Sequence, residues 1–383
     1  MSNSFTEVTP KLLAQGLLAL RENCVMPRLV NRSYDTLAAQ KGAAINVPIP
    51  SAVATTDVSP SHTAPDASSS VPTSAVIQLD KWKEAAFYLT DKEMLECMDG
   101  TIPMQASEAI KSLSNTVNSD IFALYKKVYS YGGTAGTTPF GDGKTTDINQ
   151  ARKRLNQQLA PLGDRYFVYD PETEAAAATI AAFQSVYASN DTTAIQTGMI
   201  MNKIGFGWVM EQNVPTHTAG TITTGLKAKA ATAQALGDTT IVCTTAASTG
   251  ACALKEGDII TFAGSDQTYV LSADATQATA ATDVTLNISP GLVKALAGGE
   301  DVAVKDSHVV NMAFHRDFAA FATRPLDATS VYGNMPVMSA VDPVSGLSLR
   351  LEITRENKQN RFSYDILYGC GVVRPQLATR VAG

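Results

Sequence analysis

The stretch LKEGDIITFAG, residues 254–264, contains one of four short segments that are rich in β-forming residues. The other three are TTIVCTT at 239–245, QTYVLSA at 267–273 and DVTLNIS at 283–289. Several short strands at this spacing predict a small β-barrel or β-sandwich. Between Thr216 and Asp306 the composition also shifts abruptly toward Ala, Thr and Gly, which indicates a separate module.

The segments that flank this module predict strands of a different sheet. GFGWVMEQNVP (205–215) precedes the module and HVVNMAFH (308–315) follows it. We expect these two strands to be neighbours in one sheet, so that the β-rich segment at 221–306 is a domain inserted into another domain. The next residues, RDFAAFATR at 316–324, predict a helix.

An α/β region lies on the N-terminal side of the module. RYFVYD at 165–170 predicts a short strand. Asp170 followed by Pro171 predicts the start of an alanine-rich helix that reaches about Tyr187. Asp147, with Gln150 three residues later, predicts the start of another helix.

The longest predicted helix begins at Pro103. Its apolar residues recur at steps of three and four and form one seam: Ile110, Leu113, Val117, Ile121, Leu124 and Val128. At about 1.5 Å per residue, a helix that continues to Tyr131 is a rod of roughly 40 Å, which suits a spine lying across a sheet. That sheet is predicted near the C-terminus, where 347–353 and 362–368 alternate apolar and polar residues around a turn at 356–360.

The N-terminal part predicts a helix and then a long hairpin. Thr9 followed by Pro10 is typical of a helix start, and an apolar stripe continues to about Cys24. AINVPIP at 44–50 reads as an edge strand because of its prolines, and AVIQLDKWKEAAFYL at 75–89 resumes strand character. Thr90-Asp-Lys-Glu93 is a capping box that opens a short helix.

The stretch between the two arms, PSAVATTDVSPSHTAPDASSSVPTS at 50–74, contains no Lys, no Arg and no aromatic residue. Ordering about 25 residues costs on the order of 25–50 kcal/mol of backbone entropy, which a loop with almost no large apolar side chain cannot recover against its own domain. Half of the loop, fully extended, reaches roughly 40 Å. The loop is therefore either disordered or ordered by other chains. In the second case Asp57, His62 and Asp66 are the candidate subunit-interface residues, with the carboxylates accepting hydrogen bonds and cations from a neighbour.

Composition argues against several classes of protein. The chain has 383 residues, of which 45% are hydrophobic and 17% charged, and its formal net charge is -6. A general nucleic-acid-binding protein should carry a basic face instead. No apolar stretch approaches the roughly 20 residues of a membrane span, and no N-terminal run resembles a signal peptide, so no membrane partner is expected.

The five cysteines, Cys24, Cys97, Cys243, Cys252 and Cys370, include no Cys-x-x-Cys pair. An odd number of scattered cysteines in a long chain predicts no disulfide framework. Cys243 and Cys252 would pair only if they faced each other across a hairpin.

No catalytic, cofactor-binding or metal-ligating residue is predicted. The glycine-rich run at 131–147 lacks the first glycine of a phosphate loop, because Thr138 occupies that position. The run also follows a helix rather than a strand, so a flexible connection is favoured. The four histidines, His62, His217, His308 and His315, show no metal-ligand spacing, and no nucleophile motif is present.

Three stretches resemble the major coat protein of short-tailed, double-stranded-DNA phages: LKEGDIITFAG, YFVYDPETEAAAA at 166–178 and ILYGCGVVRPQLATRV at 366–381. The order of predicted elements is similar over nearly the whole chain. The resemblance implies an α+β chain with the capsid fold common to tailed phages and herpesviruses, in the branch that carries an inserted small β-barrel domain.

The resemblance also implies a division into parts. An N-terminal arm (1–43) precedes an extended loop (44–89) that laps over a neighbouring subunit. The peripheral domain (90–135 and 325–383) contains the spine helix and the C-terminal hairpin. The axial domain (136–220 and 307–324) gathers around the capsomer centre, and the inserted domain (221–306) aids subunit folding.

The implied function is that of a major capsid protein that self-assembles into the icosahedral head of a tailed phage, without enzymatic activity or cofactor. Implied partners are further copies in hexamers and pentamers, a scaffolding protein, a portal, and double-stranded DNA contacted weakly on the inner face. The implied location is the virion, assembled in the host cytoplasm. Two alternatives remain: a secreted or surface adhesin, suggested by the Thr/Ala-rich module, and a hydrolase with an appended β-domain, which would need convergent titratable groups.

Overall fold

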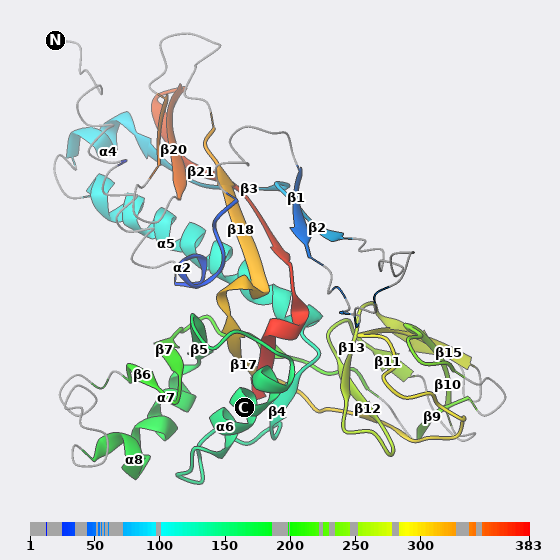
Figure 1. Ribbon diagram of the computed structural model, residues 1–383. Helices are drawn as coiled ribbons and strands as arrows, with labels where there is room; N and C mark the ends of the chain where they lie inside the picture. The colour runs from blue at the N-terminus through cyan, green and yellow to red at the C-terminus, as the bar shows by residue number, and fades with distance from the viewer. Residues whose placement is uncertain are drawn as a thin grey trace. The chain divides into compact units, whose positions relative to one another are not determined.

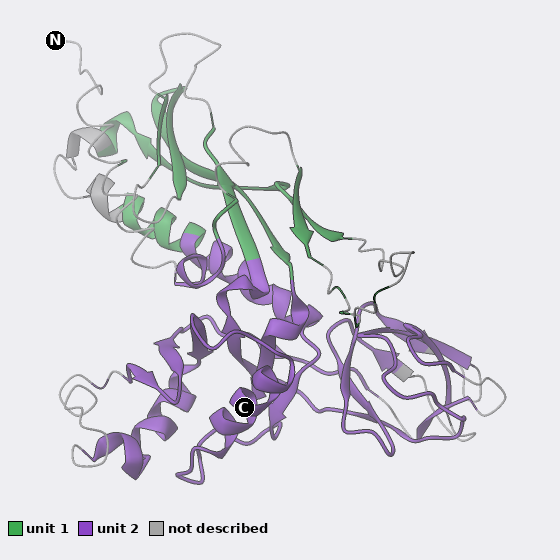
Figure 2. Cartoon of the chain, in the orientation of Figure 1, with its two compact units in different colours: residues 1–23, 32–113, 320–373 green, residues 24–31, 114–319, 374–383 purple. Residues whose placement is uncertain are grey.

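The computed structural model divides into two compact units (Figure 2). Unit 1 comprises residues 1–23, 32–113 and 320–373, and unit 2 comprises 24–31, 114–319 and 374–383. The structure describes residues 13, 25–34, 44–50, 53, 55, 57, 60, 72–96, 101–185, 198, 200–221, 225–229, 234–245, 252–277, 283–326, 337–341 and 347–383. The predicted N-terminal helix, except for Leu13, and most of the loop at 50–74 lie outside the described residues.

Unit 1 is built on a five-stranded sheet. Its order is β18 (Ala319–Arg324), β21 (Gln359–Val372), β20 (Ser348–Glu356) and β19 (Val337–Val341), and β3 (Lys81–Thr90) also pairs with β21. Strands β20 and β21 form the predicted C-terminal hairpin, which is confirmed. Its turn is tight, and Lys358 adopts a left-handed conformation with a φ of 59°.

The predicted long hairpin differs from the observed one in its second arm. Strand β1 (Ala44–Ile49) pairs with β2 (Thr73–Gln78), but the chain then turns and β3 joins the sheet of the C-terminal hairpin. A stack of Phe87 on Phe362, with ring centroids 5.1 Å apart, accompanies the new pairing. The apolar residues of 75–89 therefore serve two different sheets.

The helix predicted over 316–324 is wrong. The structure has one 3-10 turn, η2 (Arg316–Phe318), followed by strand β18. Residues 319–322 of that strand are each at most 1% exposed. Small alanine side chains let a strand be covered on both faces, and this burial outweighs the weak helical preference of alanine.

The spine is helix α5 (Thr101–Phe122), and its predicted apolar seam is confirmed. Ile110, Leu113, Val117 and Ile121 are all at most 2% exposed. The helix ends earlier than predicted, because η1 (Ala123–Lys127) and the short strand β4 (Tyr131–Gly133) follow it. In unit 1, Gln105 and Ala109 of α5 line a groove with Phe87, so this part of the helix runs beside β3 (Figure 1).

Helix α4 (Asp91–Glu96) begins at the predicted capping box. The Thr90 N–H donates to Glu93 at 2.9 Å, and the Glu93 N–H donates to the Thr90 hydroxyl at 3.3 Å. These reciprocal bonds satisfy two backbone donors at the helix start. The predicted helix start is therefore confirmed.

Unit 2 contains a seven-stranded sheet. Its order is β4, β22 (Ala378–Ala382), β17 (His308–His315), β5 (Arg165–Tyr169), β7 (Phe206–Met210) and β6 (Asn202–Lys203), with β8 (Thr216–His217) beside β17. The strands predicted at 205–215 and 308–315 share this sheet but are not neighbours, because β5 lies between them. The β5 residues Phe167, Val168 and Tyr169 are at most 1% exposed, as expected for a central strand.

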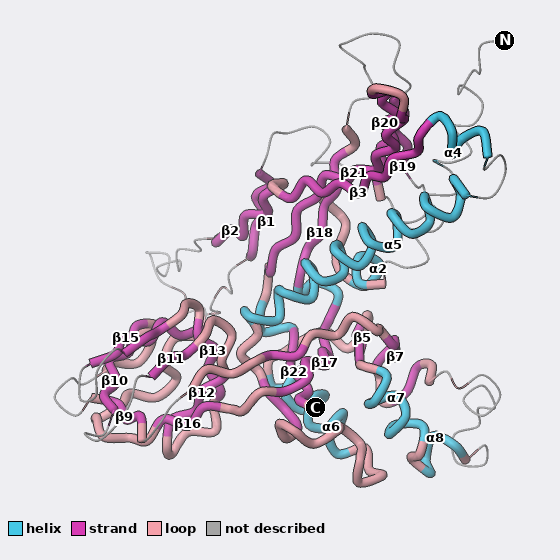
Figure 3. The backbone as a smooth tube through the Cα atoms, turned by 180° about the vertical axis from the view of Figure 1, so that it is seen from behind, coloured by secondary structure: helices cyan, strands magenta, loops and turns pink. Residues whose placement is uncertain are grey.

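Short helices complete unit 2. Helix α6 (Thr146–Gln157) packs against β22 (Figure 3) and also contacts β4. The alanine-rich helix is split into α7 (Pro171–Ala178) and α8 (Ala181–Gln184). The α7 start is confirmed, because the Asp170 carboxylate accepts the Glu172 N–H at 3.2 Å. The remaining short helices are α2 (Met26–Leu29) and η3 (Pro375–Leu377).

A second sheet of unit 2 closes into a small barrel. Its order is β16 (Val302–Val304), β12 (Ile259–Phe262), β13 (Thr268–Leu271), β15 (Asp283–Ser289), β10 (Thr240–Thr245) and β9 (Leu226–Ala228). A bridge from Lys227 to Asp301 brings the first and last strands together. Strands β11 (Cys252–Leu254) and β14 (Ala275–Gln277) form a separate pair.

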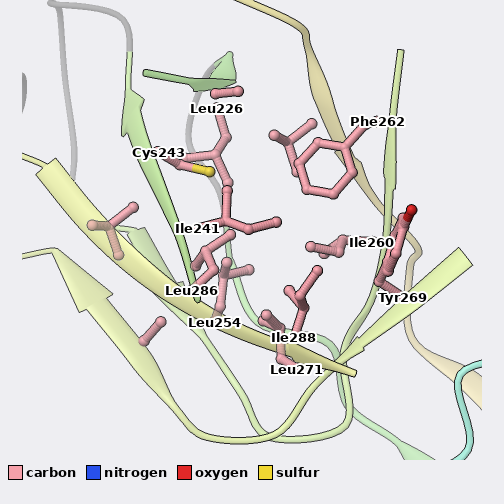
Figure 4. Packing of buried hydrophobic residues seen from close by; sticks show 14 of the residues in the cluster. Leu226, Ile241, Cys243, Leu254, Ile260, Phe262, Tyr269, Leu271, Leu286 and Ile288 are labelled. Atoms are coloured by element: carbon pink, nitrogen blue, oxygen red, sulfur yellow. The ribbon is translucent and has the colours of Figure 1, made fainter. Parts of the chain in front are cut away.

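Apolar side chains fill the barrel (Figure 4). Phe262 and Tyr269 meet at 5.5 Å between ring centroids, and Ile241, Leu271 and Leu286 are fully buried. The four segments with β-forming residues thus supply one core.

Cys243 and Cys252 lie in different strand pairs of unit 2. Cys243 is opposite Val284 on one side and Ala228 on the other, whereas Cys252 is opposite Gln277. The two residues do not face each other across a hairpin, which was the arrangement that a disulfide between them would require.

Candidate assembly surface and buried polar cluster

Of the three predicted interface residues, Asp57 is exposed, and His62 and Asp66 lie outside the described residues. Whether the three act together stays a prediction. The structure does describe the base from which their loop departs.

This base is held firmly in unit 1. Ile45, Val47 and Ile77 of the β1–β2 pair are at most 4% exposed and pack with Ala320 and Ala322 of β18. Strand β21 also passes very close. A Cβ added at Gly369 would lie 2.1 Å from the Gln78 carbonyl oxygen, so only glycine permits this approach. Both ends of the loop therefore start from an ordered, buried base.

One face of the unit 1 sheet carries exposed aromatic residues. Trp82 is 63% exposed and Tyr88 is 49% exposed, both on β3. The Trp82 indole N–H donates to Asp365 at 2.8 Å, and Asp365 also accepts two bonds from the Arg350 guanidinium, from Nε at 2.9 Å and from Nη2 at 2.5 Å. The exposed tryptophan is thus held in a defined orientation.

Ion pairs extend across the same sheet. Arg361 donates to Glu84 at 2.6 Å, and Arg355 donates to Asp91 at 2.6 and 2.9 Å. The hydrogen bonds from Arg355 lower the pKa of the Asp91 carboxyl. Exposed pairs of this kind contribute little to folding, but they hold the charges of this face in a defined arrangement. Sequence reasoning missed this surface, although the alternation of Trp82, Glu84 and Tyr88 along KWKEAAFYL signals it.

A buried polar cluster joins the barrel to the seven-stranded sheet within unit 2. The Tyr125 hydroxyl of η1 lies 3.1 Å from His217 Nδ1, and His217 Nε2 lies 2.8 Å from the Asp258 carboxylate. Asp258 belongs to the turn between β11 and β12. The three residues are 6%, 3% and 0% exposed, respectively.

Asp258 is the centre of this cluster. Its carboxylate also accepts the Gly220 N–H at 3.1 Å and the Lys255 N–H at 2.8 Å. A Cβ at Gly220 would lie 2.2 Å from the Ala253 carbonyl oxygen, so the chain can enter the barrel here only as glycine. The buried carboxylate is therefore well satisfied by neighbouring donors, as buried charges require.

Arg380 of β22 approaches the same turn from the other side. It is 0% exposed; its Nη1 donates to the Gly257 carbonyl at 2.8 Å, and its guanidinium lies 4.9 Å from the Tyr125 ring centroid. Burial lowers the pKa of Arg380 to about 9, so the group stays charged at neutral pH. Barrel and sheet are thus linked by a charge as well as by apolar contacts of Ile259 and Val270 with Tyr131.

His308, at the start of β17, completes the cluster. Its ring meets Tyr131 at 5.2 Å and His217 at 5.4 Å between centroids. Its Nδ1 donates to the Asp306 carbonyl at 2.8 Å. Burial lowers the pKa of His308 to about 4, so the imidazole is neutral near pH 7.

The Tyr125–His217–Asp258 order is that of a nucleophile–base–acid relay, yet its burial leaves no route for a substrate. We therefore interpret the cluster as a structural joint. Among the described residues, no group of three His, Cys, Asp or Glu side chains is arranged to hold a metal ion. His308 and His315 stand at opposite ends of β17, as predicted.

The glycine-rich run at 131–147 follows the helical turn η1, as expected, but its first residues form strand β4 and part of it is packed. Phe140 is 1% exposed and meets Trp208 at 5.6 Å between ring centroids. None of the described helices is long and apolar enough to cross a lipid bilayer.

Comparison with known proteins places this fold. A family model described as phage capsid protein matches residues 72–240. A chain from Mycobacterium phage Che8 is 16% identical, with a TM-score of 0.52 over 93% of this chain and 90% of that chain. A chain from the capsid structure of the cyanophage P-SCSP1u is 13% identical, with a TM-score of 0.51 over 94% of this chain and 88% of that chain. No curated protein matches this sequence.

Proposed function

We infer that the protein is a phage major capsid protein, a structural subunit of the virion that forms the phage head. The observation that carries this conclusion is the phage-capsid match over residues 72–240, a stretch that includes β2, β3 and the whole spine helix. The fold shared with the Che8 and cyanophage chains over more than nine-tenths of this chain supports it.

Assembly rests on association between copies rather than on chemistry. Copies form hexamers and pentamers, and these build a closed icosahedral shell. The extended loop crosses to a neighbouring copy, the axial part (136–220 and 307–324) gathers at the capsomer centre, and the inserted barrel (221–306) supports folding of the subunit. Many weak polar contacts then add up to a stable shell while each contact stays reversible.

The other partners follow from the same role. A scaffolding protein guides assembly in the host cytoplasm, a portal occupies one vertex, and double-stranded DNA fills the interior. The formal net charge of -6 suits a shell whose inner face holds DNA weakly.

The protein has no enzymatic activity in this proposal. Tyr125, His217 and Asp258 are arranged like a catalytic relay, but all three side chains are buried. Their burial supports a structural role. Their hydrogen bonds serve to fix the barrel on the sheet.

Electron microscopy of the purified full chain tests the proposal. Closed shells of uniform diameter are expected, together with a size-exclusion peak far above the 40.5 kDa of one chain. A protein that stays monomeric at every concentration, alone and with its scaffolding protein, would contradict it.

A further inference from the structure

A polar cleft lies in unit 2 between helix α6 and the turn that joins β12 to β13. Its volume is about 670 Å³. Pockets that bind ligands usually enclose roughly 300–1,000 Å³, so the cleft is large enough to hold several residues of a peptide.

One wall of the cleft is a stripe of α6. The stripe consists of Gln150, Lys153, Arg154 and Gln157, at helical steps of three and four, and Gln158 follows at the C-cap. The opposite stripe of α6, with Ile148, Ala151 and Leu155, is fully buried and holds the helix in place. The cleft stripe is therefore available for recognition, since the fold does not need it.

The other wall is the turn residues Asp266, Gln267 and Thr268. Thr268 is only 4% exposed, and among the described residues its hydroxyl has no hydrogen-bond partner. The side-chain oxygen of Gln158 is buried without a partner in the same way. A buried polar atom without a partner costs about 1–3 kcal/mol, so both atoms point to a ligand that supplies the missing bonds.

The charge of the cleft narrows the ligand class. Burial lowers the pKa of Arg154, and the nearby Asp266 raises it. No ion pair within 4 Å is seen between a described residue and Lys153 or Arg154, so the cleft has two cations for one carboxylate. A phosphate, which only accepts hydrogen bonds, would face Asp266 and the glutamine oxygens. A peptide offers N–H donors, C=O acceptors and a carboxylate together, and it fits better.

We propose that this cleft binds the loop segment at 51–71 of a second copy of the chain. The proposal rests on the proposed function, which supplies the second copy. The segment contains Asp57 and Asp66 but no Lys or Arg, and it is rich in Ser and Thr. Its carboxylates complement Lys153 and Arg154, and its backbone satisfies Gln158 and Thr268. The loop obtains from the neighbour the contacts that its own side chains cannot provide.

Charge reversal tests the contact in the full chain. Asp57→Lys/Asp66→Lys in the loop and Lys153→Glu/Arg154→Glu in the cleft are each expected to lower the yield of closed particles at least tenfold. An equimolar mixture of the two variants restores most of the yield, because each loop then meets a complementary cleft on the other variant. Arg152→Glu, an exposed position on α6 outside the cleft lining, should leave the yield unchanged.

The outcomes separate this inference from the proposed function. Wild-type shells together with unchanged yields for both reversed variants would overturn the contact and leave the capsid role standing. Absence of wild-type shells would overturn the capsid role itself. Rescue by combining all four substitutions in one chain, without rescue by mixing, would place the contact within one chain and overturn the second-copy assignment. Loss of DNA packaging with normal shell yield in the cleft variant would indicate a phosphate ligand and overturn the peptide.

A second measurement avoids variant proteins altogether. A fluorescent synthetic peptide with the sequence of residues 50–74 is titrated with unassembled wild-type protein, and its anisotropy is followed. Saturable binding is expected, at least tenfold weaker for a peptide with Lys at positions 57 and 66. Equal binding of the two peptides, or none, would overturn the proposal.

Discussion

The barrel and the loop at 50–74 are both poor in aromatic residues and rich in small polar ones, yet their apolar residues are spaced differently. In β15 the apolar residues Val284, Leu286 and Ile288 alternate with polar ones, and all three are at most 3% exposed. The loop has no such alternation, and its longest apolar run is 52–54. The comparison teaches that the spacing of apolar residues, more than their number, decides whether a segment can build its own core.

Deletion of the loop tests this difference most directly and should have the largest effect. Deletion of residues 51–71, with a short glycine linker from Pro50 to Pro72, should leave a folded subunit that forms no stable particles. The reason is that the proposed function assigns this loop to contacts between copies. Circular dichroism and electron microscopy check the two halves of the prediction, and normal particles from the deleted protein would contradict it.

Loss of the Asp258 carboxylate should have the next largest effect, because it tests whether the barrel depends on its joint. Asp258→Ala leaves His217 and the Gly220 and Lys255 N–H groups without their acceptor. A buried donor left without its acceptor costs about 1–3 kcal/mol in the free energy of unfolding, and three donors are affected here. Urea unfolding measures the loss.

A matched exposed site provides the control for Asp258. Asp301 pairs with Lys227 at 3.1 Å, but its side chain is 70% exposed. Asp301→Ala should cost less than about 1 kcal/mol. Equal losses at the two positions would show that burial of Asp258 has no special role.

Acid should lower the stability of the unassembled chain through the buried polar cluster, to which His308 belongs. The pKa of His308 is about 4 in the folded chain, below its ordinary value of 6.5. As the pH falls below 6.5, the unfolded chain gains a proton at His308 that the folded chain does not bind, so the contribution of His308 to stability falls until about pH 4 and then stays level. The loss is at most about 3–4 kcal/mol.

Substitution His308→Gln should flatten the dependence of the free energy of unfolding on pH in this window. Burial also lowers the pKa of His315, so some dependence will remain. Urea unfolding of the unassembled chain at a series of pH values measures both proteins. If the slope is unchanged, protonation of His308 does not affect the free energy of unfolding.

The smallest expected effect concerns the exposed face of unit 1. Trp82→Ala removes one hydrogen bond to Asp365 and a side chain that is 63% exposed, so the free energy of unfolding should change by less than about 1.5 kcal/mol. If this face contacts another copy, the yield of closed particles should fall by more than this small loss of stability explains. Lys83→Ala on the same strand is the control, and equal yields for both variants would argue against a contact there.

Strict periodicity made parts of the fold predictable. The apolar seam of the spine and the alternation in the C-terminal hairpin each allow only one kind of element. The alanine-rich stretch at 316–324 has no such periodic pattern of apolar and polar residues, so burial on both faces decided its structure. The resemblance to tailed-phage coat proteins agrees with the family match and the fold.

The polar joint could not be predicted because its residues come from distant parts of the chain. Tyr125, His217, Asp258 and Arg380 belong to four separate elements, and no local spacing relates them. The cleft was missed for a similar reason. Its α6 stripe is readable as a polar helix face, but its second wall lies in the barrel.

The position of β22 has a consequence for the order of events at the ribosome. This strand sits between β4 and β17 and carries Arg380, which reaches the barrel turn at Gly257. The barrel strands are synthesised well before β22, and their strand partners are one another. A nascent chain can therefore complete the barrel while the sheet beneath it still has a gap, and the arrival of β22 fills that gap and locks the barrel to the sheet in one step.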